Sequence, residues 1–349
     1  MSQRFPLLAT LLGSGVLVGA VSTVVVATHT RASAATPTAQ PAAQSAPSTC
    51  KDEDGDGYGL GCAKGPDCND RDPSVHPGAK ETCNGRDDDC NGLVDDLASC
   101  QAPAVDPHAR VHVPAGSFVM GSAKGAADEG PEHKVIGGAF DMDRFEVTNG
   151  RYRACVASGK CTAPKLRSSN LRNGYFDDVA FAEYPVIFVD HGQAETFCKA
   201  EGGRLPTEAE WERAARGTDS PRTFPWGEKT PTCSLANMGG PGSCVGDTDR
   251  VGRRPEGASP YGADDMAGNV WEWTSDWYDA KYYEKSASSD PKGPAEGKLK
   301  VMRGGCWVSG ADSLRTTCRK AELPATWAYN VGFRCVYPAT VSATKGGAK

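Results

Sequence analysis

Cysteine is the residue that most constrains how this chain can fold. Fourteen cysteines occur among 349 residues, and all of them lie beyond residue 49. Six fall between residues 50 and 100, and eight fall in the larger remainder. Even numbers of cysteine are typical of disulfide-bonded exported proteins, because disulfides persist in an oxidising compartment. The distribution predicts a small stapled module followed by a larger domain braced by disulfides.

An apolar segment at the N-terminus agrees with export. Arg4 precedes an apolar run from Phe5 to Ala27, and residues 31–34 have the small-residue pattern of a cleavage site. We expect residues 1–34 to be a signal peptide and the remainder to be periplasmic, cell-surface or secreted. The run is long for a secretory signal, so an uncleaved N-terminal membrane anchor is the alternative.

Composition divides the rest of the chain into segments. Residues 35–49 are rich in Pro, Ala, Ser and Gln and bury too little apolar area to fold, which predicts a disordered linker. A compact module at 50–100, a linker at 101–109 and a main domain at 110–337 follow. Residues 338–349 are rich in Lys and Gly and are expected to form a disordered tail.

The formal net charge of −6 is concentrated in the module. Residues 50–100 carry 13 acidic and 5 basic side chains, which leaves the rest of the chain at +2. A nucleic-acid-binding protein needs a basic face for phosphate contacts. We therefore expect no nucleic acid partner.

The spacing of acidic residues in the module predicts cation sites. Asp52, Asp54 and Asp56 stand at positions 1, 3 and 5 of a loop with glycine at position 6, and Tyr58 can offer its carbonyl at position 7. The twelfth position is Ala rather than Glu, so the loop is not a complete EF-hand. A second acidic stretch repeats the pattern. The further ligand candidates in the module are Asp67, Asp87, Asp89, Asn91 and Asp95, with Asp96 as an alternative to Asp95.

Residues 50–100, with their Cys, Asp and Asn spacing, resemble a Cys-rich putative metal-binding motif of exported bacterial proteins. That motif is sometimes described as copper-binding, but the donors here are mostly oxygen atoms, which suit Ca²⁺. The alternative is a disulfide knot in which the aspartates only cap turns, a position that Asp favours.

Local signals place strands and helices in the main domain. Residues 111–121 alternate as a strand, a turn and a second strand. Thr148 and Asp190 can cap helices that run to about residues 156 and 201. Thr207 and Glu210 form a capping box, which predicts a third helix from residue 208 to residue 216. Beyond it, Gly, Pro and Asn recur so often that long regular elements are not expected.

Four motifs of the main domain occur in an order that points to one family. They begin at Gly203 (GRLPTEAEWE), Asp265 (DMAGNVWEWT), Val301 (VMRGGCWVSGADSLR) and Gly332 (GFRC). Together they resemble the formylglycine-generating, or sulfatase-modifying factor, family over about residues 110–337. The resemblance implies an α+β, C-type-lectin-like fold with little regular secondary structure. Enzymes of that family hold copper(I) between two cysteines and oxidise a substrate cysteine to formylglycine.

The same resemblance implies that the copper pair is missing. The positions of the family's two copper cysteines are occupied here by Ser309 and Leu314, so no catalytic residue is predicted. Cys306 occupies the place of a serine of the family's active site. We expect Cys306 and Cys318 to form a disulfide, whereas a rearranged copper–thiol site that uses them is the alternative.

Calcium sites and disulfides are further implications of the resemblance. One buried calcium site would use the side chains of Asp265 and Glu272, although core packing with a buried hydrogen bond is the alternative role for Glu272. The same site would also use the backbone carbonyls of Gly268 and Val270. A second calcium site would use Asn237, the Met238 carbonyl and Asp247 (or Asp249). The expected disulfides of this domain, besides Cys306–Cys318, are Cys198–Cys335, Cys155–Cys161 and Cys233–Cys244.

These observations favour an exported, calcium-stabilised protein that is non-catalytic and has a binding or accessory role. Its ligand would be a peptide, protein or glycan, recognised by loops such as 166–181 and 279–298. The alternative is a copper-dependent oxidase that converts a substrate cysteine to formylglycine, or modifies a thiol in a related way, with a rearranged site.

Overall fold

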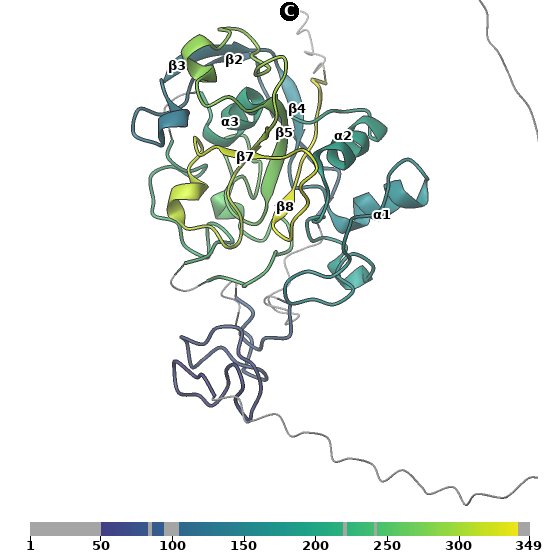
Figure 1. Ribbon diagram of the computed structural model, residues 1–349, viewed down its shortest axis with the longest axis vertical. Coiled ribbons are helices and arrows are strands. Elements are labelled where there is room, and N and C mark those ends of the chain that lie inside the picture. Colours follow the sequence, from purple (N-terminus) through teal and green to yellow (C-terminus); the bar gives the residue numbers. More distant parts are fainter. Residues whose placement is uncertain (1–49, 83–85, 94–104, 219–221, 241–242, 341–349) are drawn as a thin grey trace, which may run out of the picture. The chain divides into compact units, whose positions relative to one another are not determined.

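The computed structural model describes residues 50–82, 86–93, 105–218, 222–240 and 243–340 (Figure 1). The expectations for the signal segment and the 35–49 linker lie outside these residues, as do those for most of the second linker and of the C-terminal tail. Asp95 also lies outside them. Among the described residues, no helix is both long and apolar enough to cross a membrane.

Three small sheets organise the main domain. One has the antiparallel order β1-β4-β9, a second pairs β2 with β3, and the third has the order β7-β6-β5-β8 with β5 and β8 parallel. The strands are β1 (Arg110–Val113), β2 (Gly116–Met120), β3 (His133–Gly137), β4 (Phe140–Asp143), β5 (Trp271–Trp277), β6 (Lys300–Arg303), β7 (Lys320–Glu322), β8 (Val331–Gly332) and β9 (Val336–Pro338).

The first two strands confirm the expected strand–turn–strand pattern. Val111 and Val113 are buried on one face of β1, and Phe118 and Met120 are buried on one face of β2. This alternation follows from the two-residue period of a strand. β9 pairs with β4, so the last strand of the domain lies beside a strand near its beginning.

Three α-helices form where the capping signals predict them: α1 (Asn149–Ala157), α2 (His191–Ala200) and α3 (Glu208–Arg216). Asp190 Oδ1 accepts from the Gln193 amide at 2.9 Å, and Thr207 Oγ1 accepts from the Glu210 amide at 3.2 Å. α3 ends at Gly217, whose φ of 78° suits a residue without a Cβ.

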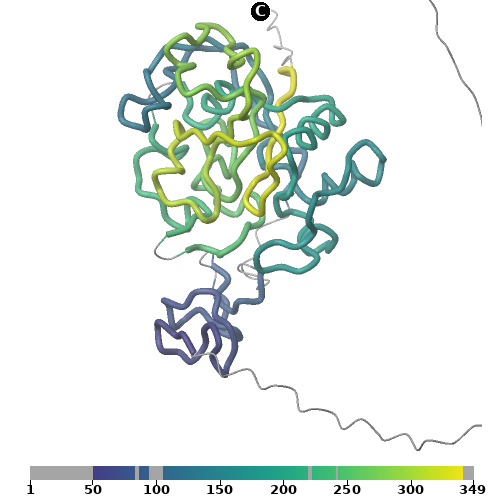
Figure 2. The backbone as a smooth tube through the Cα atoms, viewed as in Figure 1, coloured from purple at the N-terminus to yellow at the C-terminus, as the bar shows by residue number. Residues whose placement is uncertain are grey.

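The largest cluster of buried apolar side chains joins α1 and α2 to the C-terminal strands. The Tyr152 ring stacks on Phe197 with centroids 5.4 Å apart, and Phe333 meets the Phe197 ring edge-on at 5.5 Å. The Cys198–Cys335 disulfide closes the same region. Figure 2 shows the yellow C-terminal segment running beside the teal helical region.

Five disulfides are formed among the described residues, and they confirm three of the expected pairs. The bonded pairs are Cys155–Cys161, Cys198–Cys335 and Cys233–Cys244 in the main domain, and Cys50–Cys62 and Cys68–Cys90 in the module. The described part of the chain has short strands and three α-helices of nine or ten residues, which is the α+β fold with little regular structure that the sequence predicts.

Candidate functional site

The segment after β6 contains Ser309 and Leu314, the two positions that the family resemblance assigns to the copper cysteines. The chain leaves Arg303 through Gly304 and Gly305, whose φ values are 97° and 76°. A Cβ on Gly305 would lie 2.7 Å from Leu314 Cδ2. The glycines therefore allow the loop to pack tightly against the following 3-10 helix, η5 (Ala311–Leu314).

Cys306 is the buried thiol of this loop, with 1% of its surface exposed. Ser309 Oγ accepts a hydrogen bond from the Cys306 amide at 3.0 Å and lies 3.3 Å from Cys306 Sγ. Asn330 Nδ2 donates to the same sulfur at 3.3 Å. The Ser309 hydroxyl thus holds the loop around Cys306.

Leu314 is fully buried and packs in an apolar cluster with Phe224, Ala236 and Ala267. Copper(I) prefers soft thiolate ligands, whereas Leu314 offers no donor atom and Ser309 offers only a hydroxyl. These two positions therefore lack the donor chemistry of a two-cysteine copper site.

The expected Cys306–Cys318 disulfide is wrong, because both cysteines are free thiols in the structure. The Cys306 sulfur lies between Ser309 and Asn330, whereas Arg303 Nη1 donates to the Cys318 carbonyl at 2.6 Å. Burial raises the pKa of the Cys318 thiol, so this group is held in its protonated form. An even number of cysteines in a domain therefore does not require every one to be paired.

Glu272, an expected calcium ligand on β5, is held by an arginine. Arg334 Nη2 donates to Oε1 at 2.7 Å and Arg334 Nε donates to Oε2 at 2.8 Å, while Trp211 Nε1 donates to Oε2 at 2.8 Å. All three side chains have little or no exposed surface in the core. This arrangement agrees with the alternative role of a buried hydrogen-bonded residue, and the calcium role of Glu272 stays a prediction.

The other residues of that expected site lie on one tight segment. Asp265 Oδ2 accepts from the Gly252 amide at 2.8 Å, and burial, with a contribution from Asp264, raises the pKa of Asp265 to about 6. The Gly268 amide donates to the Gly304 carbonyl at 2.9 Å. The segment from Asp265 to Val270 is therefore tied to the start of the Cys306 loop.

The second expected site is partly assembled. Asn237 Nδ2 donates to the Asp247 carbonyl at 2.8 Å, and the buried Asn237 Oδ1 has no hydrogen-bond partner among the described residues. The Asp247 carboxylate, however, lies 3.2 Å from Arg172 Nη1. The Met238 carbonyl accepts from the Cys244 amide at 3.1 Å. The structure thus brings the predicted residues together, but Asp247 already has a cationic partner.

Glu146 is a buried acid that sequence reasoning did not assign to any site. Its carboxylate accepts from Asn269 Nδ2 at 2.6 Å and from the Val270 amide at 3.2 Å. Burial, together with the nearby charges of Asp265 and Glu272, raises its pKa well above the ordinary value. Its proximity to two expected ligands depends on tertiary contacts, since more than 100 residues separate Glu146 from Val270.

The first acidic loop of the module brings Asp52, Asp54 and Asp56 together, with one carboxylate oxygen of each lying within 4.8 Å of the others. Asp52 accepts from the amides of Gly55 and Gly57 at 2.6 and 2.9 Å. One oxygen each of Asp54 and Asp56 is buried without a hydrogen-bond partner. The sequence-predicted cluster is therefore assembled and presents oxygen donors alone.

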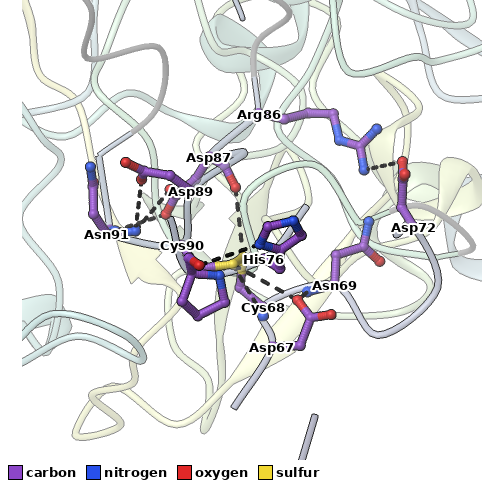
Figure 3. Close-up of a disulfide and its surroundings, with 12 residues drawn as sticks. Asp67, Cys68, Asn69, Asp72, His76, Arg86, Asp87, Asp89, Cys90 and Asn91 are labelled. Carbon is purple, nitrogen blue, oxygen red and sulfur yellow. Dashed lines mark hydrogen bonds and ion pairs between the residues drawn. A yellow bond between two sulfur atoms is a disulfide. The ribbon is translucent and has the colours of Figure 1, made fainter. Parts of the chain in front are cut away.

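The second acidic loop contains a ligand candidate that the sequence did not reveal. Glu81 joins Asp87 and Asp89 in a cluster whose oxygens lie within 4.8 Å of one another, and Glu81 Oε2 is buried without a partner. Burial raises the pKa of Asp87 to about 7. Figure 3 shows Asp87, Asp89 and Asn91 grouped beside the disulfide of Cys68 and Cys90.

Two other candidates in the module lie near that disulfide and the first loop. Asp67 belongs to a cluster with Cys68 and Cys90, but sulfur in a disulfide is not available as a thiolate ligand. The Tyr58 ring stacks on His76 with centroids 4.8 Å apart. The ligand candidates that the module offers are therefore oxygen atoms.

Comparison with known proteins gives the family. The model of the sulfatase-modifying factor enzyme 1-like domain matches residues 98–339, and a motif described as "Putative metal-binding motif" matches residues 67–96. The chain belongs to the sulfatase-modifying factor family.

The curated relatives of this chain are named for different activities. The formylglycine-generating enzyme of Streptomyces coelicolor is 32% identical over 293 residues, which cover 69% of this chain and 93% of the relative. The serine/threonine-protein kinase pkn1 of Chlamydia pneumoniae is 40% identical over 237 residues, and a hercynine oxygenase of Mycolicibacterium thermoresistibile is 35% identical over 231 residues. These matches cover 64% and 56% of this chain, but only 37% of the kinase and 50% of the oxygenase.

Solved structures support the fold. PvdO from Pseudomonas aeruginosa aligns with a TM-score of 0.55 and 27% identity over 68% of this chain and all of that protein. Treponema denticola variable protein 1 aligns with a TM-score of 0.53 and 22% identity over 66% of this chain and 95% of that protein, which supports the fold alone. Relatives with this scaffold thus differ in function, so function must be argued from the residues of the site.

Proposed function

We propose that this protein is an exported binding or accessory protein that uses the family scaffold without its copper chemistry. The buried Leu314 carries the proposal. It replaces the second copper cysteine with an apolar side chain that is part of a hydrophobic cluster. The Ser309 hydroxyl, in place of the first cysteine, is engaged by the Cys306 amide at 3.0 Å.

The surface near Cys306 supports a binding role. Val308, Leu323, Trp327 and Tyr329 are exposed large apolar side chains. The segments that carry them are adjacent, since the Trp307 and Tyr329 ring centroids are 5.5 Å apart. Exposed aromatic residues supply large contact area to peptide, protein or glycan ligands at low entropic cost.

Calcium in the module is the second part of the proposal. Asp54, Asp56 and Glu81 each have a buried carboxylate oxygen without a partner, and a hard oxygen-seeking cation would satisfy these oxygens. A module of about fifty residues has little core, so an ion would add to the order that its disulfides impose. Export agrees with the five disulfides, because such bonds persist outside the cytoplasm.

The experiment is a copper-dependence assay on the full chain produced in an oxidising compartment. The protein is supplied with copper(I), reductant and dissolved O2 as the oxidant, and is incubated with a Cys-x-Pro-x-Arg peptide. Mass spectrometry follows conversion of the peptide cysteine to an aldehyde. No conversion above a copper-free control supports the proposal. Copper-dependent conversion overturns it.

A second candidate function is a copper-dependent oxidase with a rearranged site. The observation in its favour is that Cys306 and Cys318 are free and belong to one core region, with Cys306 buried in it and Cys318 packed against it. If the assay shows conversion, Cys306→Ser and Cys318→Ser should each abolish it. Conversion that survives both substitutions would exclude these thiols as the copper ligands.

A further inference from the structure

A cavity of about 290 Å³ lies beside the residues that follow η5. Four cationic side chains line it: Lys124, Arg216, Arg222 and Arg315. Two carboxylates, Glu132 and Glu228, line it as well. Cations therefore outnumber carboxylates in the lining, and none of these six residues was assigned a role from the sequence.

We propose that this cavity binds a small oxyanion, namely a phosphate or sulfate group. Among the described residues, no carboxylate lies within ion-pair distance of the Arg222 guanidinium or the Lys124 ammonium group. A guanidinium carries five N–H donors in a planar fork that matches the oxygens of a tetrahedral anion. The N–H groups of Arg222 and Lys124 can therefore donate hydrogen bonds to an anion bound in the cavity.

Arg216 adds a buried donor to this surplus. Only 4% of its surface is exposed, and its Nη1 donates to the Val119 and Gly121 carbonyls and to Glu212 Oε1. Its Nε has no hydrogen-bond partner in the structure. A buried N–H without a partner costs about 1–3 kcal/mol, so protein acceptors do not satisfy this guanidinium completely.

The backbone that presents Arg222 is fixed by the segment after η5. Thr316 Oγ1 donates to the Arg222 carbonyl at 2.7 Å, and the Thr316 amide donates to the Thr223 carbonyl at 2.8 Å. The cavity therefore has a wall built from two segments that are 94 residues apart in sequence.

The carboxylates in and next to the cavity already accept hydrogen bonds from the protein. Glu129 accepts two from Arg315, at 2.6 and 2.7 Å, and so neutralises the Arg315 charge. Glu228 accepts from the Thr223 amide and hydroxyl at 2.8 and 2.6 Å. Glu132 Oε1 accepts from the Ala123 amide at 3.2 Å. The Lys124 ammonium and the Arg216 guanidinium lie close enough to Glu228 to help lower its pKa, but neither forms an ion pair with it at 4.0 Å or less. Arg222 is the cation of the lining that no described carboxylate balances.

The cavity is large enough for a tetrahedral anion. Its volume of about 290 Å³ is close to the lower bound of roughly 300 Å³ for pockets that hold drug-sized molecules. The proposal goes beyond the proposed function and does not depend on it, because it uses neither Cys306 nor Ser309.

The test is isothermal titration of the full chain with inorganic phosphate and, separately, with sodium sulfate, with sodium chloride at the same ionic strength as reference. We expect saturable binding of at least one oxyanion and none of chloride. Arg222→Ala and Lys124→Ala should each weaken binding by at least about tenfold, since a charge-assisted hydrogen bond contributes that much or more. Stronger binding of phosphate or of sulfate would identify which group the site prefers.

Lys134→Ala is the matched control. Lys134 is an exposed residue of β3 outside the cavity lining, and its loss changes the net charge by the same amount. It should leave the affinity unchanged. Absence of saturable binding to both oxyanions, or an equal loss of affinity in Lys134→Ala, would overturn the proposal, because the second result indicates only general charge attraction.

Discussion

Arg334 holds both carboxylate oxygens of Glu272, at 2.7 and 2.8 Å, in a core where neither side chain exceeds 1% exposure. Glu272 lies on β5 and Arg334 just after β8, so the pair connects two strands that are parallel neighbours. Two donors on a planar fork give this ion pair a fixed geometry. The carboxylate that the family resemblance assigns to calcium is thus already compensated by a cation.

Glu272→Gln should lower the free energy of unfolding by about 3–5 kcal/mol, because it leaves the buried Arg334 charge without its partner. Urea denaturation measures this change. Glu210→Gln is the control, since the Glu210–Arg204 pair has the same two short contacts but an arginine with half of its side chain exposed. It should cost less than about 1 kcal/mol. If Glu272→Gln were equally mild but abolished a calcium-dependent rise in Tm, Glu272 would be a metal ligand instead.

The double substitution Ser309→Cys and Leu314→Cys should create copper(I) affinity that the natural chain lacks at this loop. The two thiolates would occupy the family's ligand positions on a backbone that already follows the family fold. Titration with copper(I) against a competing chelator measures the affinity. Ser309→Cys alone is the control and should bind much more weakly. Replacing the buried Leu314 also removes core packing, which costs up to about 2–5 kcal/mol and is checked by Tm.

Asp276 should make the protein less stable as pH rises. Burial, with a contribution from Glu208, raises the pKa of Asp276 to about 7 from an ordinary value of 3.8. The folded state therefore binds a proton that the unfolded chain releases, so stability falls between about pH 4 and pH 7 by up to about 1.4 kcal/mol per pH unit. Urea midpoints at several pH values should show this slope, and Asp276→Asn should remove most of it. An unchanged slope in the variant would mean that Asp276 does not carry the effect.

The two free thiols should differ in reactivity. Cys318 is half-buried and Cys306 has 1% of its surface exposed. Native protein treated with an alkylating reagent should be modified slowly at Cys318 and not at Cys306, whereas unfolded protein should be modified at both. Peptide mass spectrometry without reduction reads out each site. A Cys306–Cys318 cross-linked peptide would contradict the free thiols of the structure.

Glu81→Gln should weaken calcium binding by the module. Removing one charge from the cluster of Glu81, Asp87 and Asp89 reduces its attraction for a divalent cation. Calcium titration of chelator-treated full chain measures the effect, which we expect to be at least about tenfold. Glu53→Gln is the matched control, because Glu53 is exposed and pairs with Arg71 at 3.1 Å. Equal affinity in both variants would exclude Glu81 as a ligand.

Sequence patterns predicted much of the fold correctly. The three helices begin at Asn149, His191 and Glu208, directly after the capping residues Thr148, Asp190 and Thr207. A cap acts within three residues, so its signal is complete in the local sequence. The family motifs likewise identified the scaffold, because they depend on residue identity at fixed spacing. The loss of the copper cysteines at Ser309 and Leu314 stays a prediction.

Only the tertiary structure revealed how distant groups compensate one another. The Arg334–Glu272 pair spans 62 residues, and the contact between Glu146 and the Val270 amide spans 124 residues. No local sequence pattern predicts these long-range contacts, since they depend on how the whole domain packs. The free state of Cys306 and Cys318 has the same origin. The sequence by itself determined which chemical groups are present and where the helices begin. Tertiary packing decided which charged groups pair and whether the two thiols bond. The reason is that a buried polar group can bond only with the partners that the fold places within hydrogen-bond distance.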